Sequence, residues 1–249
     1  MSDIQSLHRA FAILQIISQQ PQAARPVSIA TQTGLPNTTV LRMLTTLENI
    51  GAVVRDVEAG TYGIGTVVYD LAHPKPSHQQ LKEAARPYMH QLANQTGETV
   101  YLCAEAGEQV YYVDQIDTEH HILLRNWIDI AFPLHTTAAG KVLLAFWEDA
   151  KIQAYLARPL EQYTENTIID PDAICAYVEM IRKNGFAWTH GQTEEGLVGV
   201  AAPIWGQSQQ IVGALSLGGP AFRFPKAGEA EQVAQQVVET AKQISSQLA

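Results

Sequence analysis

The sequence has few cysteines, few basic residues and no long apolar run. Its 249 residues include two cysteines, Cys103 and Cys175, which are too few for a disulfide framework or a zinc knuckle. The longest apolar stretches, such as residues 142–147, are too short to span a bilayer. The chain starts without a basic segment followed by an apolar one, so we expect no signal peptide. These absences predict a cytoplasmic protein that makes no contact with a membrane.

Positive charge is scarce and unevenly spread. The net charge is −9, yet residues 1–76 carry five basic and five acidic side chains and are neutral. Residues 77–249 carry 11 basic and 20 acidic side chains and hold the whole excess. Because a negative surface repels phosphate, only the first segment is expected to lie against a nucleic acid. Apolar residues make up 46% of the chain, which is enough for the cores of two domains.

The first third is predicted to hold three helices and a hairpin. Ser28 is the expected N-cap of the second helix, which ends at Gly34. A third helix starts at Pro36-Asn37 and ends before Gly51. Two short strands follow at residues 52–56 and 61–64. In the first helix, over residues 5–18, the apolar face predicted to be buried comprises Leu7, Ala10, Phe11, Leu14 and Ile17.

Helix, short helix, turn, helix and hairpin is the order of a winged helix-turn-helix domain. The polar face of the third helix carries Thr38, Arg42, Thr45 and Asn49, which are hydrogen-bonding side chains suited to a major groove. Ser28, Thr38 and Thr39 lie at helix starts, where backbone N–H groups also favour phosphate. Arg55 and Thr61 flank the expected wing and are placed to contact the DNA backbone. Any surface helix can show such a polar face, so the complete order of elements carries the interpretation.

The Pro-rich stretch around residues 74–78 indicates a linker. We therefore predict a winged helix-turn-helix domain at 1–65, a linker helix and linker at 66–78, and an effector-binding and oligomerisation domain at 79–249. Strand pairs joined by short turns in the last segment favour an antiparallel sheet. The predicted helices cover residues 79–95, 137–147, 149–156, 171–184 and 226–247, and the predicted strands cover 99–104, 109–116, 121–127, 186–190, 197–204 and 210–217.

The helix after Thr136-Thr137 is a candidate ligand site. Its first residues, Ala138, Ala139 and Gly140, have almost no side chain, so an anion such as a carboxylate could approach the free N–H groups. The same residues would equally allow the helix to pack closely on a sheet. Ser216 and Gly218 share one face of a strand, where Ser216 either binds a ligand or is a satisfied core serine. Gly199 marks another place of close approach.

The sequence offers little evidence of catalysis. His135 and Ser216 could be drawn into a hydrolase site, but the chain has no Gly-x-Ser-x-Gly elbow and no glycine-rich phosphate loop. His120 and His121 are adjacent, so on a strand they would face opposite sides and not chelate one metal. A cluster of Cys103, His135 and His190 is a weak metal candidate. We therefore expect no catalytic residues, no metal and no cofactor.

The chain resembles the IclR family of bacterial transcription regulators over nearly its whole length. No single motif is decisive, but their order and spacing together are specific. The first half carries Ile4-Gln-Ser-Leu-x-Arg9-Ala10 with Ile13-Leu14, Gly34-Leu-Pro-x-Thr-Thr-Val-x-Arg42, Leu47 with Gly51, and Tyr62-x-Ile64-Gly65. The second half carries Pro133-Leu-His-Thr-Thr-Ala-Ala-Gly-Lys-Val-Leu-Leu-Ala145, Ile181-Arg-x-x-Gly-Phe-Ala187, Gly196-x-x-Gly-Val-Ala-Ala-Pro-Ile204 and Gly213-Ala-Leu-Ser-Leu-x-Gly-Pro220.

The resemblance implies an α+β protein with an N-terminal winged helix and a GAF-like effector domain built on a six-stranded antiparallel sheet. It implies homodimers or homotetramers that bind double-stranded operator DNA and a small organic acid or aromatic effector. The implied DNA contacts are Arg9, Ser28, Asn37, Thr38, Thr39, Arg42, Thr45 and Arg55. The implied effector contacts are Ala138, Ala139, Gly199, Ser216 and Gly218, with Phe132 and Leu197 as apolar wall.

Three positions depart from the family pattern. Asn37 stands where a basic or small residue is common, Gln192 where an acidic residue is frequent, and Gly199 where some members have cysteine or serine. The pocket therefore has few side-chain donors beyond Ser216. We expect a ligand held by backbone N–H groups and apolar contacts, and larger than a two- or three-carbon acid.

The sequence thus predicts a transcriptional regulator whose operator affinity shifts when the effector favours one arrangement of its DNA-binding domains. The resemblance implies a repressor, which is the commoner mode of the family. Two alternatives stay open at this point. One is a metabolite sensor that acts on protein partners, and the other is a hydrolase that uses His135 and Ser216. Neither the effector, the operator nor the sign of regulation follows from the sequence.

Overall fold

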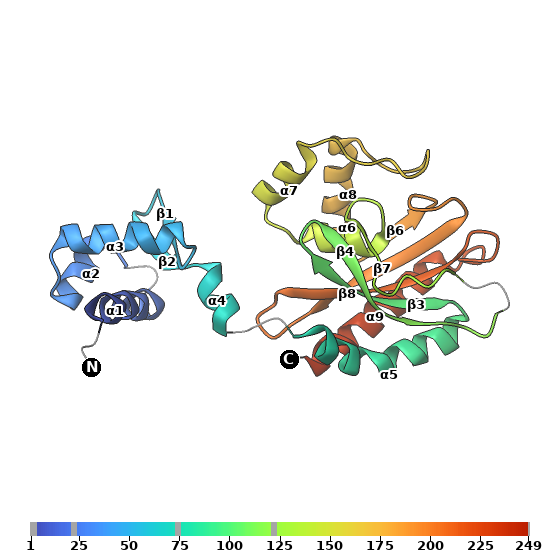
Figure 1. The fold of residues 1–249 in the computed structure, drawn as a ribbon, viewed down its shortest axis with the longest axis horizontal. Coiled ribbons are helices and arrows are strands. Elements are labelled where there is room, and N and C mark those ends of the chain that lie inside the picture. Colours follow the sequence, from blue (N-terminus) through green and yellow to red (C-terminus); the bar gives the residue numbers. More distant parts are fainter. Residues whose placement is uncertain (1–3, 21–23, 73–75, 121–123, 249) are drawn as a thin grey trace. The chain divides into compact units, whose positions relative to one another are not determined.

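The structure is a computed structural model that describes residues 4–20, 24–72, 76–120 and 124–248. It divides into two compact units, Met1–Lys75 and Pro76–Ala249 (Figure 1). We call them unit 1 and unit 2. The functional division of the chain at residues 65 and 78 stays a prediction.

Unit 1 has three helices, a two-stranded hairpin and a fourth helix. The helices are α1 (Gln5–Gln19), α2 (Pro26–Thr33), α3 (Asn37–Asn49) and α4 (Thr66–Ala72), and the hairpin pairs β1 (Val53–Asp56) with β2 (Thr61–Ile64). Gly51 follows α3 with φ 74°, and the N–H of Ala52 donates to the carbonyl of Leu47 over 2.8 Å, which closes the helix end. The predicted winged helix-turn-helix order is confirmed.

The predicted buried face of α1 is partly wrong. Ile17 is fully buried, but Leu7 is 56% exposed and Phe11 is 66% exposed. The helix buries Ile17, as predicted, together with Ile13, which the predicted face did not include, against α2 and α3. The error has a physical cause: α1 is apolar on two sides, so helical spacing alone does not say which side meets the core.

The start of α2 also differs from the prediction. The helix begins at Pro26, and Arg25 is its N-cap residue without a side-chain cap. Ser28 therefore lies inside the first turn, and its Oγ accepts a hydrogen bond from Gln32 over 3.2 Å. Proline lacks the N–H that a cap would satisfy and suits the first helical position, so it takes precedence over the serine.

Unit 2 is built on one six-stranded antiparallel sheet. The strands are β3 (Thr99–Ala106), β4 (Gln109–Ile116), β5 (Ala131–Pro133), β6 (Ala187–His190), β7 (Leu197–Trp205) and β8 (Ile211–Pro220). Their order across the sheet is β5-β4-β3-β8-β7-β6. The predicted α+β class and the six-stranded antiparallel sheet are confirmed.

Helices cover both faces of this sheet (Figure 1). One face is covered by α5 (His78–Thr96) and α9 (Ala230–Gln247), and the other by α6 (Ala138–Ala145) together with α7 (Asp149–Leu156) and α8 (Pro171–Asn184). Side chains on β3 alternate accordingly. Val100 and Leu102 pack toward α5 and α9, whereas Tyr101 and Cys103 pack toward α6. Unit 2 therefore has two apolar cores separated by one sheet.

At one edge of the sheet, the strand beside β4 differs from the sequence prediction. The strand predicted at residues 121–127 is not found at 124–127, which are irregular, and its first three residues lie outside those described. The edge strand beside β4 is β5 instead.

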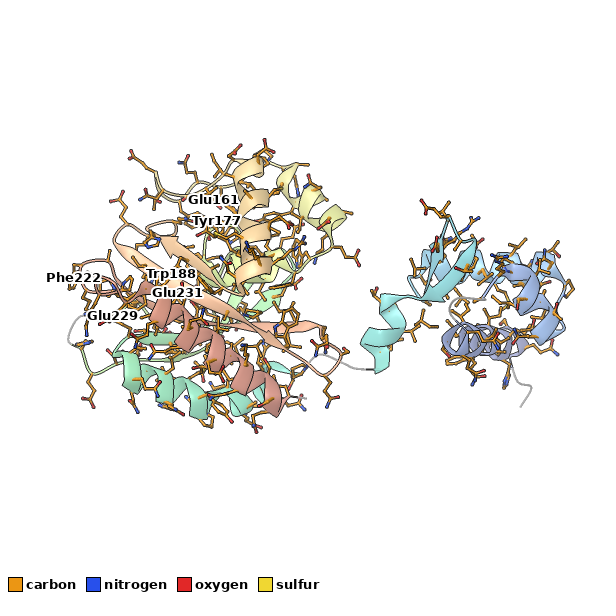
Figure 2. The ribbon with its side chains drawn as sticks, turned by 180° about the vertical axis from the view of Figure 1, so that it is seen from behind. Glu161, Tyr177, Trp188, Phe222, Glu229 and Glu231 are labelled. Carbon is orange, nitrogen blue, oxygen red and sulfur yellow. The ribbon has the colours of Figure 1, made fainter. Side chains whose placement is uncertain are left out.

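At the opposite edge, the hydroxyl of Tyr177 on α8 donates to the carbonyl of Trp188 on β6 over 2.6 Å (Figure 2). This bond occupies a backbone acceptor on β6, an edge strand that pairs with β7 on its other side.

Candidate functional site

The outward face of α3 is the candidate nucleic-acid interface of unit 1. Its apolar side buries Val40, Leu44 and Leu47 in the core of the unit. The opposite side exposes Thr38, Arg42, Thr45 and Asn49, as the 3.6-residue spacing predicts, and Asn37 is exposed as well. The guanidinium of Arg42 makes no hydrogen bond or ion pair with any other described residue, so it is available to a partner.

The remaining predicted contacts of unit 1 are less uniform. Ser28 and Thr39 are only half-exposed. Arg9 is exposed on α1, where its guanidinium donates to the Gln5 side chain over 3.3 Å. Arg55 is exposed on β1, but Thr61 is only 7% exposed, so the expectation that Thr61 contacts DNA is wrong. Its place at the start of β2 turns it toward the core rather than outward.

The tip of the hairpin is acidic. Asp56 and Glu58 are both exposed, and one carboxylate oxygen of Asp56 accepts from the N–H groups of Glu58 and Ala59, each over 3.0 Å. This bonding stabilises the turn and keeps the carboxylate at the tip. Because carboxylates repel phosphate, Arg55 is the one hairpin side chain in the described residues that is suited to a DNA backbone contact.

A narrow cavity of about 20 Å³ lies between α6 and the sheet of unit 2. Its floor follows the strand register: Thr189, Gly199 and Gly218 pair in one row across β6, β7 and β8. In the next row, Ser216 pairs with Tyr101 of β3. The complete lining is Tyr101, Tyr112, Leu124, Trp127, Thr137, Ala138, Thr189, Thr193, Leu197, Val198, Gly199, Ser216 and Gly218.

The N-terminus of α6 closes one side of this cavity. Thr137 is the N-cap, and its Oγ1 accepts from the N–H of Gly140 over 2.9 Å, as its sequence position suggests. The N–H groups of Ala138 and Ala139 have no hydrogen-bond partner among the described residues, although both residues are buried. Unpaired N–H groups at a helix N-terminus carry partial positive charge and favour a negatively charged ligand.

Gly140 serves packing rather than the cavity. A Cβ atom added there would lie 2.4 Å from the carbonyl oxygen of Leu134, so only glycine allows α6 to approach that backbone. The two interpretations of the Ala138-Ala139-Gly140 segment therefore apply to different residues. Gly140 allows close packing, whereas Ala138 lines the cavity.

Hydroxyl groups make up most of the polar surface of the cavity, and aromatic rings make up most of its apolar surface. Ser216 donates to the carbonyl of Val200 over 3.2 Å, and Thr193 donates to that of Thr136 over 2.9 Å, so both protons are committed to the protein. Burial raises the pKa of Tyr101 and Tyr112 well above the usual value, so both hydroxyls stay protonated at neutral pH. Within the described residues, no lysine, arginine or histidine lines this space.

Most of the predicted effector contacts meet at this cavity. Ala138, Leu197, Gly199, Ser216 and Gly218 all line it. Two others do not. Ala139 is completely buried in the α6 side of the core, and Phe132 lies behind the wall, where its ring contacts those of Tyr112 and Trp127 at centroid distances of 5.8 and 5.0 Å. Their roles as ligand contacts stay predictions.

The aromatic wall was missed from the sequence. Tyr101, Tyr112 and Trp127 pack their rings together at centroid distances between 5.1 and 5.6 Å. They come from β3, β4 and the irregular segment before β5, and only the folded sheet brings these together. Period-2 alternation places Tyr101 on the face of β3 opposite Val100, but it does not identify the face that meets α6.

The residues considered for catalysis or metal binding make other contacts. Nε2 of His135 donates to the carbonyl of Glu161 over 2.9 Å, and Nδ1 accepts from the hydroxyl of Tyr155 over 2.8 Å. Burial lowers the pKa of His135, which favours this neutral form. No group of three histidine, cysteine or acidic side chains among the described residues is placed to hold a metal ion. His135 and Ser216 thus have separate hydrogen-bond partners and form no pair.

Comparisons with known proteins match two family models, one in the first part of the chain and one in the rest. A family model described as "IclR helix-turn-helix domain" matches residues 6–57. Another, described as "Bacterial transcriptional regulator IclR C-terminal", matches residues 75–246. Of the helices in the described residues, none is long and apolar enough to cross a bilayer.

The chain is also similar to individual regulators. It is 28% identical over 218 residues to the HTH-type transcriptional regulator XynR of Escherichia coli K12, covering 87% of this chain and 86% of XynR. It is 27% identical over 245 residues to the HTH-type transcriptional repressor AllR of Salmonella typhimurium, covering 98% and 90%. The crystal structure of Thermotoga maritima IclR matches with TM-score 0.64 and 27% identity over 99% of both chains.

A further solved structure shares the fold. The IclR homologue of Microbacterium hydrocarbonoxydans, complexed with 4-hydroxybenzoate, matches with TM-score 0.63 and 22% identity over 98% of both chains.

Proposed function

Because this chain belongs to the IclR family of bacterial transcriptional regulators, we propose that it is a repressor whose operator affinity is set by an aromatic or other medium-sized organic acid bound between α6 and the sheet of unit 2. As a member of this family it is a DNA-binding regulator of transcription. The proposal concerns the effector class, the sign of regulation and the residues involved.

The unpaired N–H group of Ala138, at the point where α6 lines the cavity, carries the proposal. Leaving a buried backbone donor without a partner costs roughly 1–3 kcal/mol, so an oxygen atom of the ligand is expected to satisfy this N–H group. The cavity holds no basic side chain within the described residues, so the helix terminus supplies its positive potential. The rings of Tyr101, Tyr112 and Trp127 then offer an apolar wall to the rest of the ligand.

This arrangement favours an acid with a flat or apolar body. Leu124 and Leu197 add apolar surface, whereas the hydroxyl of Thr189 has no protein partner among the described residues and can bond a polar substituent. At about 20 Å³ the cavity admits an acid only after its wall side chains move apart, and a two- or three-carbon acid would then leave most of the apolar wall uncovered. We expect calorimetry to show tighter binding of benzoate and 4-hydroxybenzoate than of pyruvate or glyoxylate, and the reverse order would contradict the proposed effector class.

The proposed DNA contacts lie on unit 1. Arg42, Thr38 and Thr45 on the exposed face of α3 are assigned to the major groove, and Arg55 to a phosphate beside the hairpin. Ser28, Asn37, Thr39 and Arg9 are assigned to the DNA backbone near helix starts. The unit carries no net charge and has little lysine, so one copy alone is expected to bind weakly, and two half-sites supply the affinity.

We further propose that the chain works as a homodimer or homotetramer in the cytoplasm. The exposed side of α1 presents Ile4, Leu7 and Phe11 at helical spacing, with exposures of 62, 56 and 66%. Such an apolar stripe on a small domain is typical of an interface with a second copy. Replacing Phe11 with glutamate is expected to shift the protein toward smaller assemblies in sedimentation velocity, and an unchanged assembly would exclude the α1 stripe from the interface.

The effector site is tested by Ala138→Asp. The new carboxylate would lie among the unpaired N–H groups and repel an anionic ligand, so we expect the response of operator binding to organic acids to be lost. Binding to the operator itself is expected to persist, because unit 1 is untouched. A mobility-shift assay on the DNA flanking the gene, with and without each acid, measures both properties.

Ala138→Asn provides the matched control, since asparagine has nearly the same size and no charge. If the helix terminus binds an anion, the asparagine variant keeps a weakened response and the aspartate variant keeps none. A normal response of the aspartate variant to an acidic effector would count against the site. A regulator is also expected to release no product from these acids, and turnover would support the hydrolase alternative. Absence of any DNA shift would support a sensor of protein partners.

A further inference from the structure

The exposed face of α3 carries one apolar side chain among its polar ones. Leu41 is 42% exposed, one helical turn after Asn37 and one turn before Thr45, both of which are exposed. A single exposed leucine on a protein surface needs no explanation by itself. This one is adjacent to Arg42, on the part of the helix that the DNA-binding function places in the major groove.

The threonines near Leu41 cannot serve as donors to a base while the helix keeps its geometry. The hydroxyl of Thr45 donates to the carbonyl of Leu41 over 3.0 Å, and that of Thr46 donates to the carbonyl of Arg42 over 3.0 Å. These bonds use the only proton of each hydroxyl. The middle of α3 therefore presents carbon atoms and hydrogen-bond acceptors, apart from the guanidinium of Arg42.

The major groove offers one apolar group to such a surface. Base edges there consist of donors and acceptors, apart from the C5-methyl group of thymine. If Leu41 faced a donor or acceptor, that group would lose water without gaining a hydrogen bond. Contact with a thymine methyl avoids this cost and buries carbon on both sides.

We propose that Leu41 selects a thymine in each operator half-site through contact with its methyl group. The inference rests on the DNA-binding function of unit 1 and assigns part of its sequence specificity to an apolar residue outside the polar set of Thr38, Arg42 and Thr45. It makes position 41 a specificity-determining position, because a polar side chain there would favour a different base.

Deoxyuridine tests the contact, since it differs from thymidine only by this methyl group. The full-length protein is first used to select its preferred duplex from a randomised library. Each thymine of the selected half-site is then replaced by deoxyuridine in turn, and affinities are measured at one salt concentration. We expect one position at which the replacement weakens wild-type binding roughly fourfold, and roughly fifteenfold when both half-sites are changed.

Leu41→Ala is expected to bind the thymine and deoxyuridine duplexes equally at that position. Ile50→Ala is the matched control, because Ile50 is 58% exposed in the same unit but lies beyond the end of α3. This control keeps the discrimination. Three results would overturn the inference: a selected half-site without thymine, no thymine sensitive to deoxyuridine, or a sensitivity that persists in Leu41→Ala.

Two further outcomes separate this inference from the function on which it rests. If no sequence is enriched from the library, DNA binding itself is in error and the role of Leu41 falls with it. If Leu41→Ala changes the size of the assembly in sedimentation velocity while the control does not, Leu41 contacts a second copy of the chain, and the methyl-contact inference is wrong.

Discussion

Replacing Arg42 with alanine is expected to abolish specific operator binding while ligand binding in unit 2 stays unchanged. Arg42 is exposed on α3, and no other described residue holds its guanidinium. A bidentate arginine–guanine contact is worth roughly 1–3 kcal/mol, so two half-sites in a dimer lose roughly 2–6 kcal/mol. At constant salt concentration, this corresponds to a loss of operator affinity of about thirtyfold or more.

Two variants control this result. Arg158→Ala removes the same charge from an exposed position in unit 2 and is expected to leave operator affinity nearly unchanged. Arg42→Lys keeps the charge but loses the planar fork, so it rescues binding if Arg42 contacts phosphate and fails to rescue it if Arg42 reads guanine. An unchanged footprint of Arg42→Ala would remove this residue from recognition.

The exposed positions on α3 could be predicted because the sequence of this helix has one clear apolar stripe. Val40, Leu44 and Leu47 define one buried side, which places Arg42 on the opposite side with little ambiguity. The face of α1 was predicted only in part because Phe11 and Ile13 are both apolar and lie on different sides of the helix. Helical spacing locates an apolar stripe, but it does not distinguish the side that packs in the core from an exposed apolar side.

The cavity could be predicted only in part, for a different reason. Ala138 follows a threonine cap, and Ser216 alternates with its neighbours on a strand, so local pattern indicates both. Tyr101 and Trp127 meet there because of strand order and because of the irregular segment that precedes β5, and neither is encoded in local spacing. Chemistry that depends on distant segments therefore appeared only in the folded chain.

Lys141 is a buried cation whose effect on stability should be large. It lies on α6 with 2% exposure, its Nζ donates to the side-chain oxygen of Gln192, and it lies 4.8 Å from the ring centroid of Tyr177. No carboxylate among the described residues forms an ion pair with it. Burial lowers the pKa of Lys141 from its ordinary value of 10.5 to about 7.

The sign of the pH effect follows from the protons bound in each state. Between pH 7 and 10.5 the unfolded chain keeps the Lys141 proton while the folded chain releases it, so this residue makes stability rise with pH. Below about pH 7 both states bind the proton, and the cost of burying the charge is constant at about 5 kcal/mol. Burial lowers the pKa of His135 and raises the pKa of Tyr177, so both groups shift away from the middle of this window.

Lys141→Met is therefore expected to stabilise unit 2 by roughly 2–4 kcal/mol at pH 7, after allowance for the amide oxygen of Gln192 that loses its partner. The gain should shrink to nothing or reverse by pH 10. Urea unfolding followed by tryptophan fluorescence measures it directly, because all four tryptophans of the chain belong to unit 2. Lys151→Met, which removes a half-exposed lysine paired with Glu105, is the matched control and should leave the stability of unit 2 nearly unchanged at pH 7. An equal effect of Lys141→Met at pH 7 and pH 10 would mean that Lys141 is charged in the folded protein throughout, and that the approach of Gln192 and Tyr177 compensates its burial.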